Sequence, residues 1–177
     1  MSDLDARALE AFSRYLSDLP SDARKLGRAI ADGNLDAAVR AQLAGALNYL
    51  FKSLDLIDDG IEALGYLDDA LILRIAVDQA SARGSLPEAL APLASEAALV
   101  REFLDDLGDR FQRYVQELTS VEVRGRSVEA IVGDPATQEE FLGEVSGWAH
   151  RYEAPAFLPE PKNLVKFKAF LATKLPA

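Results

Sequence analysis

Residues 71–77, with the sequence LILRIAV, limit the fold more than any other segment, because Arg74 is their only charged residue. The flanking sequence favours a helix, and at 3.6 residues per turn this helix would have no polar face. A helix that is apolar all round is normally buried on every side. The sequence therefore predicts a bundle in which other helices surround this one. A buried guanidinium at Arg74 would need a carboxylate partner.

Apolar residues recur at helical spacing along most of the chain, which is rich in Ala, Leu, Glu and Arg. We therefore predict an all-α fold, a single-domain multi-helix bundle over residues 1–177. We expect DLPSD at residues 18–22 to separate two helices. Pro92 is expected either to kink a long helix or to lie in the first turn of a new one. The predicted helices cover residues 3–17, 21–31, 35–51, 66–80, 86–118, 127–132, 134 onward and 163–174, with a loop over 120–127 and an extended segment over 153–161.

The composition excludes several classes of site. The chain has 177 residues, no cysteine and a formal net charge of −10, so it has no disulfide, thiolate metal site or thiol nucleophile. Because no Lys/Arg cluster offsets that charge, binding to nucleic acid is disfavoured. The acidic N-terminus lacks the basic residues followed by an apolar stretch that are typical of a signal peptide. The sequence also contains no run of about 18 uncharged apolar residues, the length needed to span a bilayer. We expect a cytoplasmic protein without a membrane span, for which peripheral association with a membrane stays open.

An acidic segment precedes the apolar one. Residues 55–69 hold five aspartates and a glutamate, and like charges three or four residues apart on a helix cost about 0.2–0.5 kcal/mol per pair. Capping would remove this cost: Asp55 would cap a helix that starts at Leu56, and Asp68 and Asp69 would cap the apolar helix. Gly65 fits a turn between them. Under this interpretation, the partner of Arg74 is Asp55, Asp58 or Asp69.

Two other interpretations of the acidic segment remain open. Clustered carboxylates are the ligands that Mg²⁺ and other divalent cations prefer, although the spacing is not that of an EF-hand loop. If two helices meet as a hairpin, the aspartates would converge on such an ion. The candidate ligands are Asp55, Asp58, Asp59, Asp68 and Asp69. Alternatively, the segment is an acidic surface that binds a basic partner.

The segment LDLIDDGIEALGYLDDALIL resembles the signature of the YkvA-like family, a bacterial domain of unknown function. The first half of the signature matches Asp55, Leu56, Ile57 and Asp59, and the second half matches Leu64, Gly65, Tyr66, Leu67, Asp68, Asp69 and Leu71. Ser53, Asp58 and Glu62 stand where that family usually has proline. The resemblance implies a small helical domain and carries over no activity. We expect a core hairpin over residues 35–82, with residues 86–177 as a helical extension packed on it.

These patterns favour a non-enzymatic binding or scaffold protein, with a protein partner or a second copy of the chain as its ligand. The acidic motif would serve mainly the fold, through capping and through pairing with Arg74. The competing hypothesis is an enzyme that depends on a divalent cation and acts on a phosphorylated substrate through the aspartates. No other cofactor is indicated.

Overall fold

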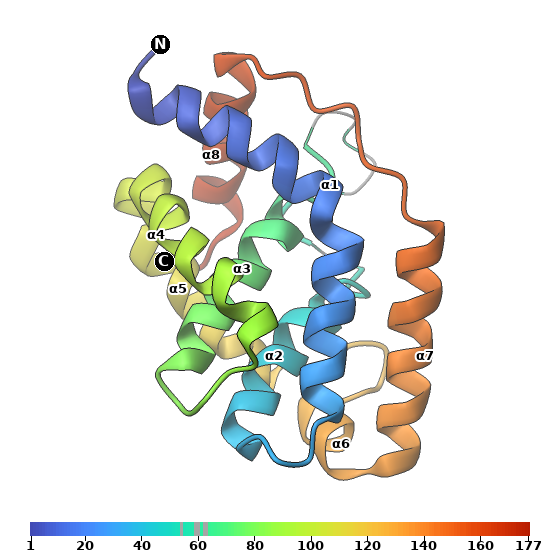
Figure 1. Cartoon of the computed structure of the whole chain (residues 1–177). Coiled ribbons are helices and arrows are strands. Elements are labelled where there is room, and N and C mark those ends of the chain that lie inside the picture. The colour runs from blue at the N-terminus through green and yellow to red at the C-terminus, as the bar shows by residue number, and fades with distance from the viewer. Residues whose placement is uncertain (54, 59–60, 62–63) are drawn as a thin grey trace.

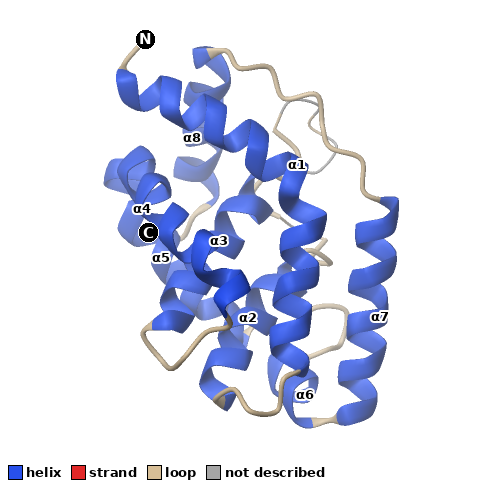
Figure 2. Ribbon diagram, in the orientation of Figure 1, coloured by secondary structure: helices blue, strands red, loops and turns tan. Residues whose placement is uncertain are grey.

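The computed structural model describes residues 1–53, 55–58, 61 and 64–177, and these residues form one compact bundle of helices (Figures 1 and 2). The all-α prediction is confirmed, since the described part of the chain contains no strand beyond a single bridge between Val123 and Arg126. The longer helices are α1 (Asp3–Ala31), α2 (Ala37–Tyr49), α3 (Leu67–Ser81), α4 (Ala91–Leu104), α5 (Gly108–Glu117), α7 (Pro135–Arg151) and α8 (Pro161–Lys174). A short helix, α6 (Val128–Gly133), and the 3₁₀ turns η1 (Glu88–Leu90), η2 (Asp105–Leu107) and η3 (Leu118–Ser120) complete the set.

Helix α3 is the central helix, as its apolar sequence predicts. Every residue from 67 to 77 is buried, including Asp68, Asp69 and Arg74. The helix packs against α2 and α4, and against α1 on a third side. Because neighbours cover this part of the helix all round, the three charged side chains within it need partners inside the protein.

Helix α1 runs without a break through Pro20, so the predicted division into residues 3–17 and 21–31 is wrong. Proline removes the amide that would bond to the carbonyl four residues earlier, which is that of Leu16. The hydroxyl of Tyr152, which follows α7, donates to this carbonyl at 2.7 Å. The bend of α1 in Figure 1 fits the usual effect of proline inside a helix. The helix therefore continues because a distant side chain replaces the missing donor.

The apolar pattern over residues 86–118 covers two helices rather than one. Pro92 lies in the first turn of α4, which agrees with one of the two expected roles. The helical path ends at Asp105, whose φ of 48° is incompatible with a right-handed helix, and η2 then leads into α5. Apolar spacing continues across this corner because both helices face the same core, and so the pattern alone does not reveal it.

The predicted start signals of two helices are confirmed. The Ser127 side chain accepts a hydrogen bond from the amide of Ala130, and the Asp134 side chain accepts one from Thr137. Residues 153–160 are extended, as their prolines predict, and connect α7 to α8 along one side of the bundle. Among the described residues, no helix combines the length and low charge needed to cross a bilayer.

The link between Tyr152 and the carbonyl of Leu16 predicts a specific coupling. Tyr152→Phe is expected to lower the free energy of unfolding by about 1 kcal/mol, because the carbonyl loses its donor. In a Pro20→Ala background the restored amide can bond to Leu16, so the same substitution should cost clearly less. A double-mutant cycle measured by urea unfolding checks this coupling. Equal costs in the two backgrounds would show that the hydroxyl does not compensate for the proline.

Candidate functional site

The aspartates of the motif occupy different environments. Asp68 is fully buried and Asp69 nearly so, both in the first turn of α3, where the helix dipole favours negative charge. Asp55 is partly exposed and Asp58 is exposed, both in the segment between α2 and α3. Asp59 lies outside the described residues. The motif is therefore divided between the core and the surface.

Asp68 joins the end of α2 to the start of α3. The hydroxyl of Tyr49, in the last turn of α2, donates to Asp68 Oδ2 at 2.5 Å and accepts a hydrogen bond from the amide of Leu56 at 2.7 Å. The amide of Ile57 also donates to Asp68 Oδ2, at 3.3 Å. We call Tyr49, Asp68 and the amides of Leu56 and Ile57 the clasp. It binds the connecting segment to both helices through the backbone.

The clasp explains why the predicted capping by Asp55 is wrong. Residues 55–58 form bends rather than a helix, because the amides of Leu56 and Ile57 face Tyr49 and Asp68. The N-cap position of α3 is held by Tyr66 in the left-handed conformation, with φ of 65°. Gly65, expected to provide the turn, lies just before it and donates its amide to the carbonyl of Ile61.

The left-handed Tyr66 carries a backbone strain of about 1–3 kcal/mol, since its side chain crowds the backbone in this region. Its ring packs edge-on against Trp148 and Tyr152, with centroids 6.0 and 5.2 Å away. These contacts connect the turn before α3 to the end of α7, where the Tyr152 hydroxyl reaches α1. The strained turn is thus held in place by the C-terminal part of the chain.

Burial also sets the ionisation of the clasp. It raises the pKa of Asp68 from its ordinary 3.8 to about 6, although the hydrogen bonds from Tyr49 and Ile57 partly oppose this rise. Burial, together with the nearby Asp68, also raises the pKa of the Tyr49 hydroxyl, which stays protonated and acts as a donor. The Lys52 ammonium lies close by and donates to the Tyr114 hydroxyl at 2.9 Å.

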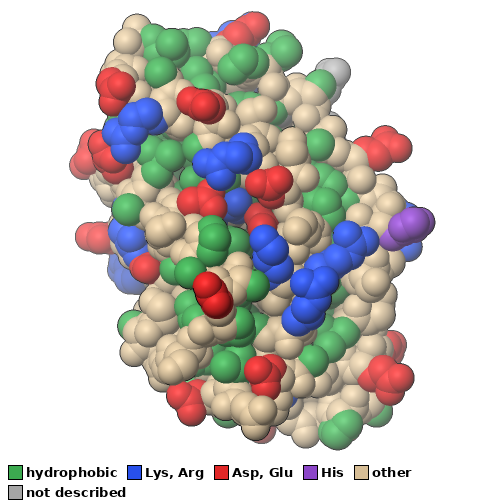
Figure 3. Space-filling view, viewed as in Figure 1, with side chains coloured by type: hydrophobic (Ala, Val, Ile, Leu, Met, Phe, Trp, Pro, Cys, Tyr) green, Lys and Arg blue, Asp and Glu red, His purple; other side chains and the backbone are tan. Residues whose placement is uncertain are grey.

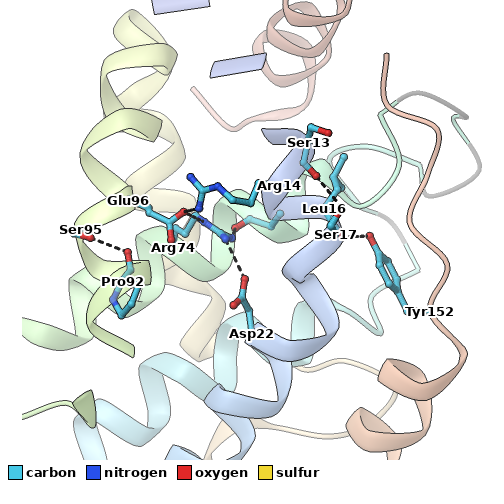
Figure 4. A network of polar contacts seen from close by, with 11 residues as sticks. Ser13, Arg14, Leu16, Ser17, Asp22, Arg74, Pro92, Ser95, Glu96 and Tyr152 are labelled. Atoms are coloured by element: carbon cyan, nitrogen blue, oxygen red, sulfur yellow. Dashed lines mark hydrogen bonds and ion pairs between the residues drawn. The ribbon is translucent and has the colours of Figure 1, made fainter. Parts of the chain in front are cut away.

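Arg74 has two carboxylate partners, and neither lies in the motif (Figure 4). Its Nη2 is 3.0 Å from Asp22 Oδ2 of α1, and its Nε is 3.4 Å from Glu96 Oε2 of α4. The guanidinium also lies over the Tyr15 ring, with Cζ 3.5 Å from the centroid. Nη1 donates to the carbonyl of Ala70 at 2.9 Å. These contacts satisfy the positive charge of Arg74, which is only 1% exposed.

The prediction that Arg74 pairs with Asp55, Asp58 or Asp69 is therefore wrong. Arg74 is five positions along the chain from Asp69, which places the two side chains about 140° apart around the helix axis. Asp55 and Asp58 lie beyond the N-terminal end of α3, while Arg74 lies in its middle. The sequence pattern does not single out Asp22 and Glu96, because each is one acid among many on an amphipathic helix. Only the packing of α1 and α4 on α3 identifies them.

Asp55 and Asp58 line a surface pocket of about 340 Å³. Lys52 and Ser53 flank them, and Arg124 and Lys174 close the pocket from the loop before α6 and from the end of α8. Within the described part of the chain, no three His, Cys, Asp or Glu side chains are grouped as a metal site would require. The pocket instead mixes cationic and anionic side chains from three parts of the sequence.

Comparison with known proteins identifies the segment that contains the clasp. Residues 39–74 match a family model described as a protein of unknown function (DUF1232). The resemblance of this segment to a domain family of unknown function is therefore confirmed. The match extends from α2 into α3, so it includes Tyr49, Asp68 and Arg74 but only a small part of the chain. Neither the curated proteins nor the solved structures gave a match. The division into residues 35–82 and 86–177 stays a prediction.

The raised pKa of Asp68 predicts how stability depends on pH. Between pH 3.8 and about 6 the folded chain holds this proton more tightly than the unfolded chain, so the contribution is present at low pH and lost as pH rises through 6. The difference in unfolding free energy between the native chain and Asp68→Asn should therefore grow by up to about 3 kcal/mol from pH 7.5 to pH 4.

Urea unfolding at a series of pH values measures this difference. Asp58→Asn is the matched control, because it removes an exposed carboxylate from the same motif and should show no comparable trend. A difference for Asp68→Asn that stays constant, or that shrinks as the pH falls, would contradict the proposed burial of an ionisable Asp68.

Proposed function

We propose that this chain is a binding or scaffold protein of the bacterial cytoplasm, and that its aspartate motif serves the fold rather than a reaction. The observation that carries this proposal is the position of Asp68, which has no exposed surface and accepts hydrogen bonds from Tyr49 and Ile57. A catalytic acid or base must come within hydrogen-bonding distance of its substrate. A carboxylate enclosed between α2 and α3 is instead suited to fixing the connection between them.

The surface beside the clasp supports a role in binding a protein partner. Lys52 and Asp58 come from the segment between α2 and α3, Arg124 from the loop before α6, and Lys174 from the end of α8. Charges of both signs around one depression favour a partner whose surface is polar. A wrong partner would bring like charges into contact with them and would be disfavoured. By holding Leu56 and Ile57, the clasp would fix the shape of this pocket.

The alternative function is that of an enzyme dependent on a divalent cation, acting on a phosphorylated substrate. Asp55 and Asp58 line the same pocket, and this observation favours the alternative. Lys52, Arg124 and Lys174 in that pocket would suit a phosphate group. The two functions differ in whether an ion binds there.

Thermal unfolding with Mg²⁺ or Mn²⁺, compared with EDTA at matched ionic strength, separates the two functions. A site filled at 100 times its Kd would stabilise the chain by about 2.7 kcal/mol, a clear rise in melting temperature. We expect no such rise, because the clasp holds Asp68 away from solvent and the described residues group no three acids as a metal site would require. Isothermal titration calorimetry with each ion provides the stoichiometry.

A single bound ion whose effect disappears in both Asp55→Asn and Asp58→Asn, the two acids that line the pocket, would overturn the binding role and establish the alternative. The partner is tested by chemical crosslinking in cell extract and by the mass of the purified chain in solution. The double substitution Lys52→Glu and Arg124→Glu should abolish a stoichiometric complex or a dimer formed at this pocket. A complex that survives this substitution would place the interface elsewhere.

A further inference from the structure

A second depression lies on another face of the molecule, between α1 and α7. These helices pack side by side in the bundle (Figure 1), and the groove between them has a volume of about 330 Å³. Its lining comes from the last two turns of α1 and the middle of α7: Arg24, Gly27, Arg28, Ala31, Leu142, Val145 and Ser146. The groove shares no lining residue with the pocket described above, so the two are separate.

The floor of the groove is apolar and is formed where the two helices approach closely. A Cβ atom at Gly27 would lie 3.4 Å from Leu142 Cδ2, in van der Waals contact, so α7 lies directly against α1 at this point. Ala31, one turn further along α1, again presents little more than backbone. Val145 closes the floor from α7. Apolar surface is therefore open to a ligand between two helices.

The rim of the groove carries two arginines with no carboxylate partner among the described residues. Arg24 and Arg28 are both exposed and lie four residues apart, a spacing at which like charges destabilise a helix. In contrast, Arg7 and Arg14, earlier on α1, each pair with a glutamate of α4 at 3.1 Å. Figure 3 shows Lys and Arg side chains gathered over the C-terminal half of α1, on the side towards α7. In a chain of net charge −10, this local excess of positive charge favours an anionic ligand.

The size of the groove decides between two kinds of ligand. From Gly27 to Ala31 the floor runs about 6 Å along α1. An amphipathic helix that docks through positions i, i+3, i+4 and i+7 needs about 10 Å. A volume of about 330 Å³ is instead within the range of small-molecule sites. We propose that the groove between α1 and α7 binds a small organic anion with an unbranched apolar body, whose carboxylate contacts Arg24 and Arg28.

Octanoate is a suitable probe for the full-length chain, followed by amide chemical shifts in ¹⁵N-labelled protein. Saturable shifts are expected at Gly27, Ala31 and Ser146. Affinity should rise by up to about fourfold per methylene until the chain fills the floor of about 6 Å, and should rise less for the last methylenes of octanoate, which extend beyond it. Octan-1-ol, which has the same chain without the charge, should bind more weakly.

Two variants separate the roles of charge and groove shape. Arg24→Gln with Arg28→Gln should weaken octanoate binding about tenfold, as expected for the loss of two exposed ion pairs. The control, Lys25→Gln with Arg83→Gln, removes the same charge from residues that do not line the groove and should leave the affinity unchanged. Ser146→Leu, at an exposed position, should fill the groove and abolish binding.

Any of three results would overturn the proposal: no shifts at millimolar octanoate, shifts that map to another surface, or octan-1-ol binding as tightly as octanoate. An equal loss of affinity in the control variant would assign the effect to net charge rather than to this groove. None of these results bears on the clasp, so the role proposed for the aspartate motif would stand independently.

Discussion

The burial of residues 67–77 of α3 on every side is the constraint on which the rest of the structure depends. A helix can be enclosed on all sides only if each charge that it carries finds a partner inside the protein, since an unpaired buried charge costs several kcal/mol. Arg74 draws Asp22 from α1 and Glu96 from α4 towards the middle of α3. Asp68 draws Tyr49 from α2 to its start. The charges of one helix thus fix how three others pack around it.

The same constraint gives the aspartate motif a physical meaning. A row of acids beside an apolar helix suggests a metal site, but its members do not act together. Asp68 faces inward and holds the backbone of the connecting segment, whereas Asp58 faces the solvent. A carboxylate in the core can accept hydrogen bonds from a tyrosine and from backbone amides at once, and an apolar residue cannot. Such an arrangement fixes one path for the chain between α2 and α3.

The sequence predicts the features that depend on local physics. The apolar pattern around residues 71–77 is enough to place α3 at the centre, and Ser127 and Asp134 mark their helix starts because capping involves only neighbouring residues. The features that it misses depend on distant contacts. The helix continues through Pro20, where the hydroxyl of Tyr152, from the far end of the chain, supplies the hydrogen bond that the Leu16 carbonyl would lack.

The partners of Arg74 are a further case. Helical spacing shows that the side chain is buried and needs an acid, but it does not show which acids the packing of α1 and α4 brings within reach. The left-handed Tyr66 is hidden for a similar reason. Sequence rules assign such a conformation to glycine, and a glycine lies next to it at position 65. The aromatic contacts of Tyr66 with Trp148 and Tyr152 become visible only in the folded chain.

Hydrogen exchange at the amides of Leu56 and Ile57 is the most direct measurement of the clasp. Tyr49→Phe removes the hydroxyl that accepts from Leu56 and donates to Asp68, and Tyr114→Phe removes a neighbouring, partly buried hydroxyl outside the clasp. In Tyr49→Phe these two amides should lose protection while the amides of residues 71–77 keep theirs, and Tyr114→Phe should leave both groups protected. Unchanged protection at Leu56 and Ile57 in Tyr49→Phe would contradict the account, because the acidic motif would then not hold the segment between α2 and α3.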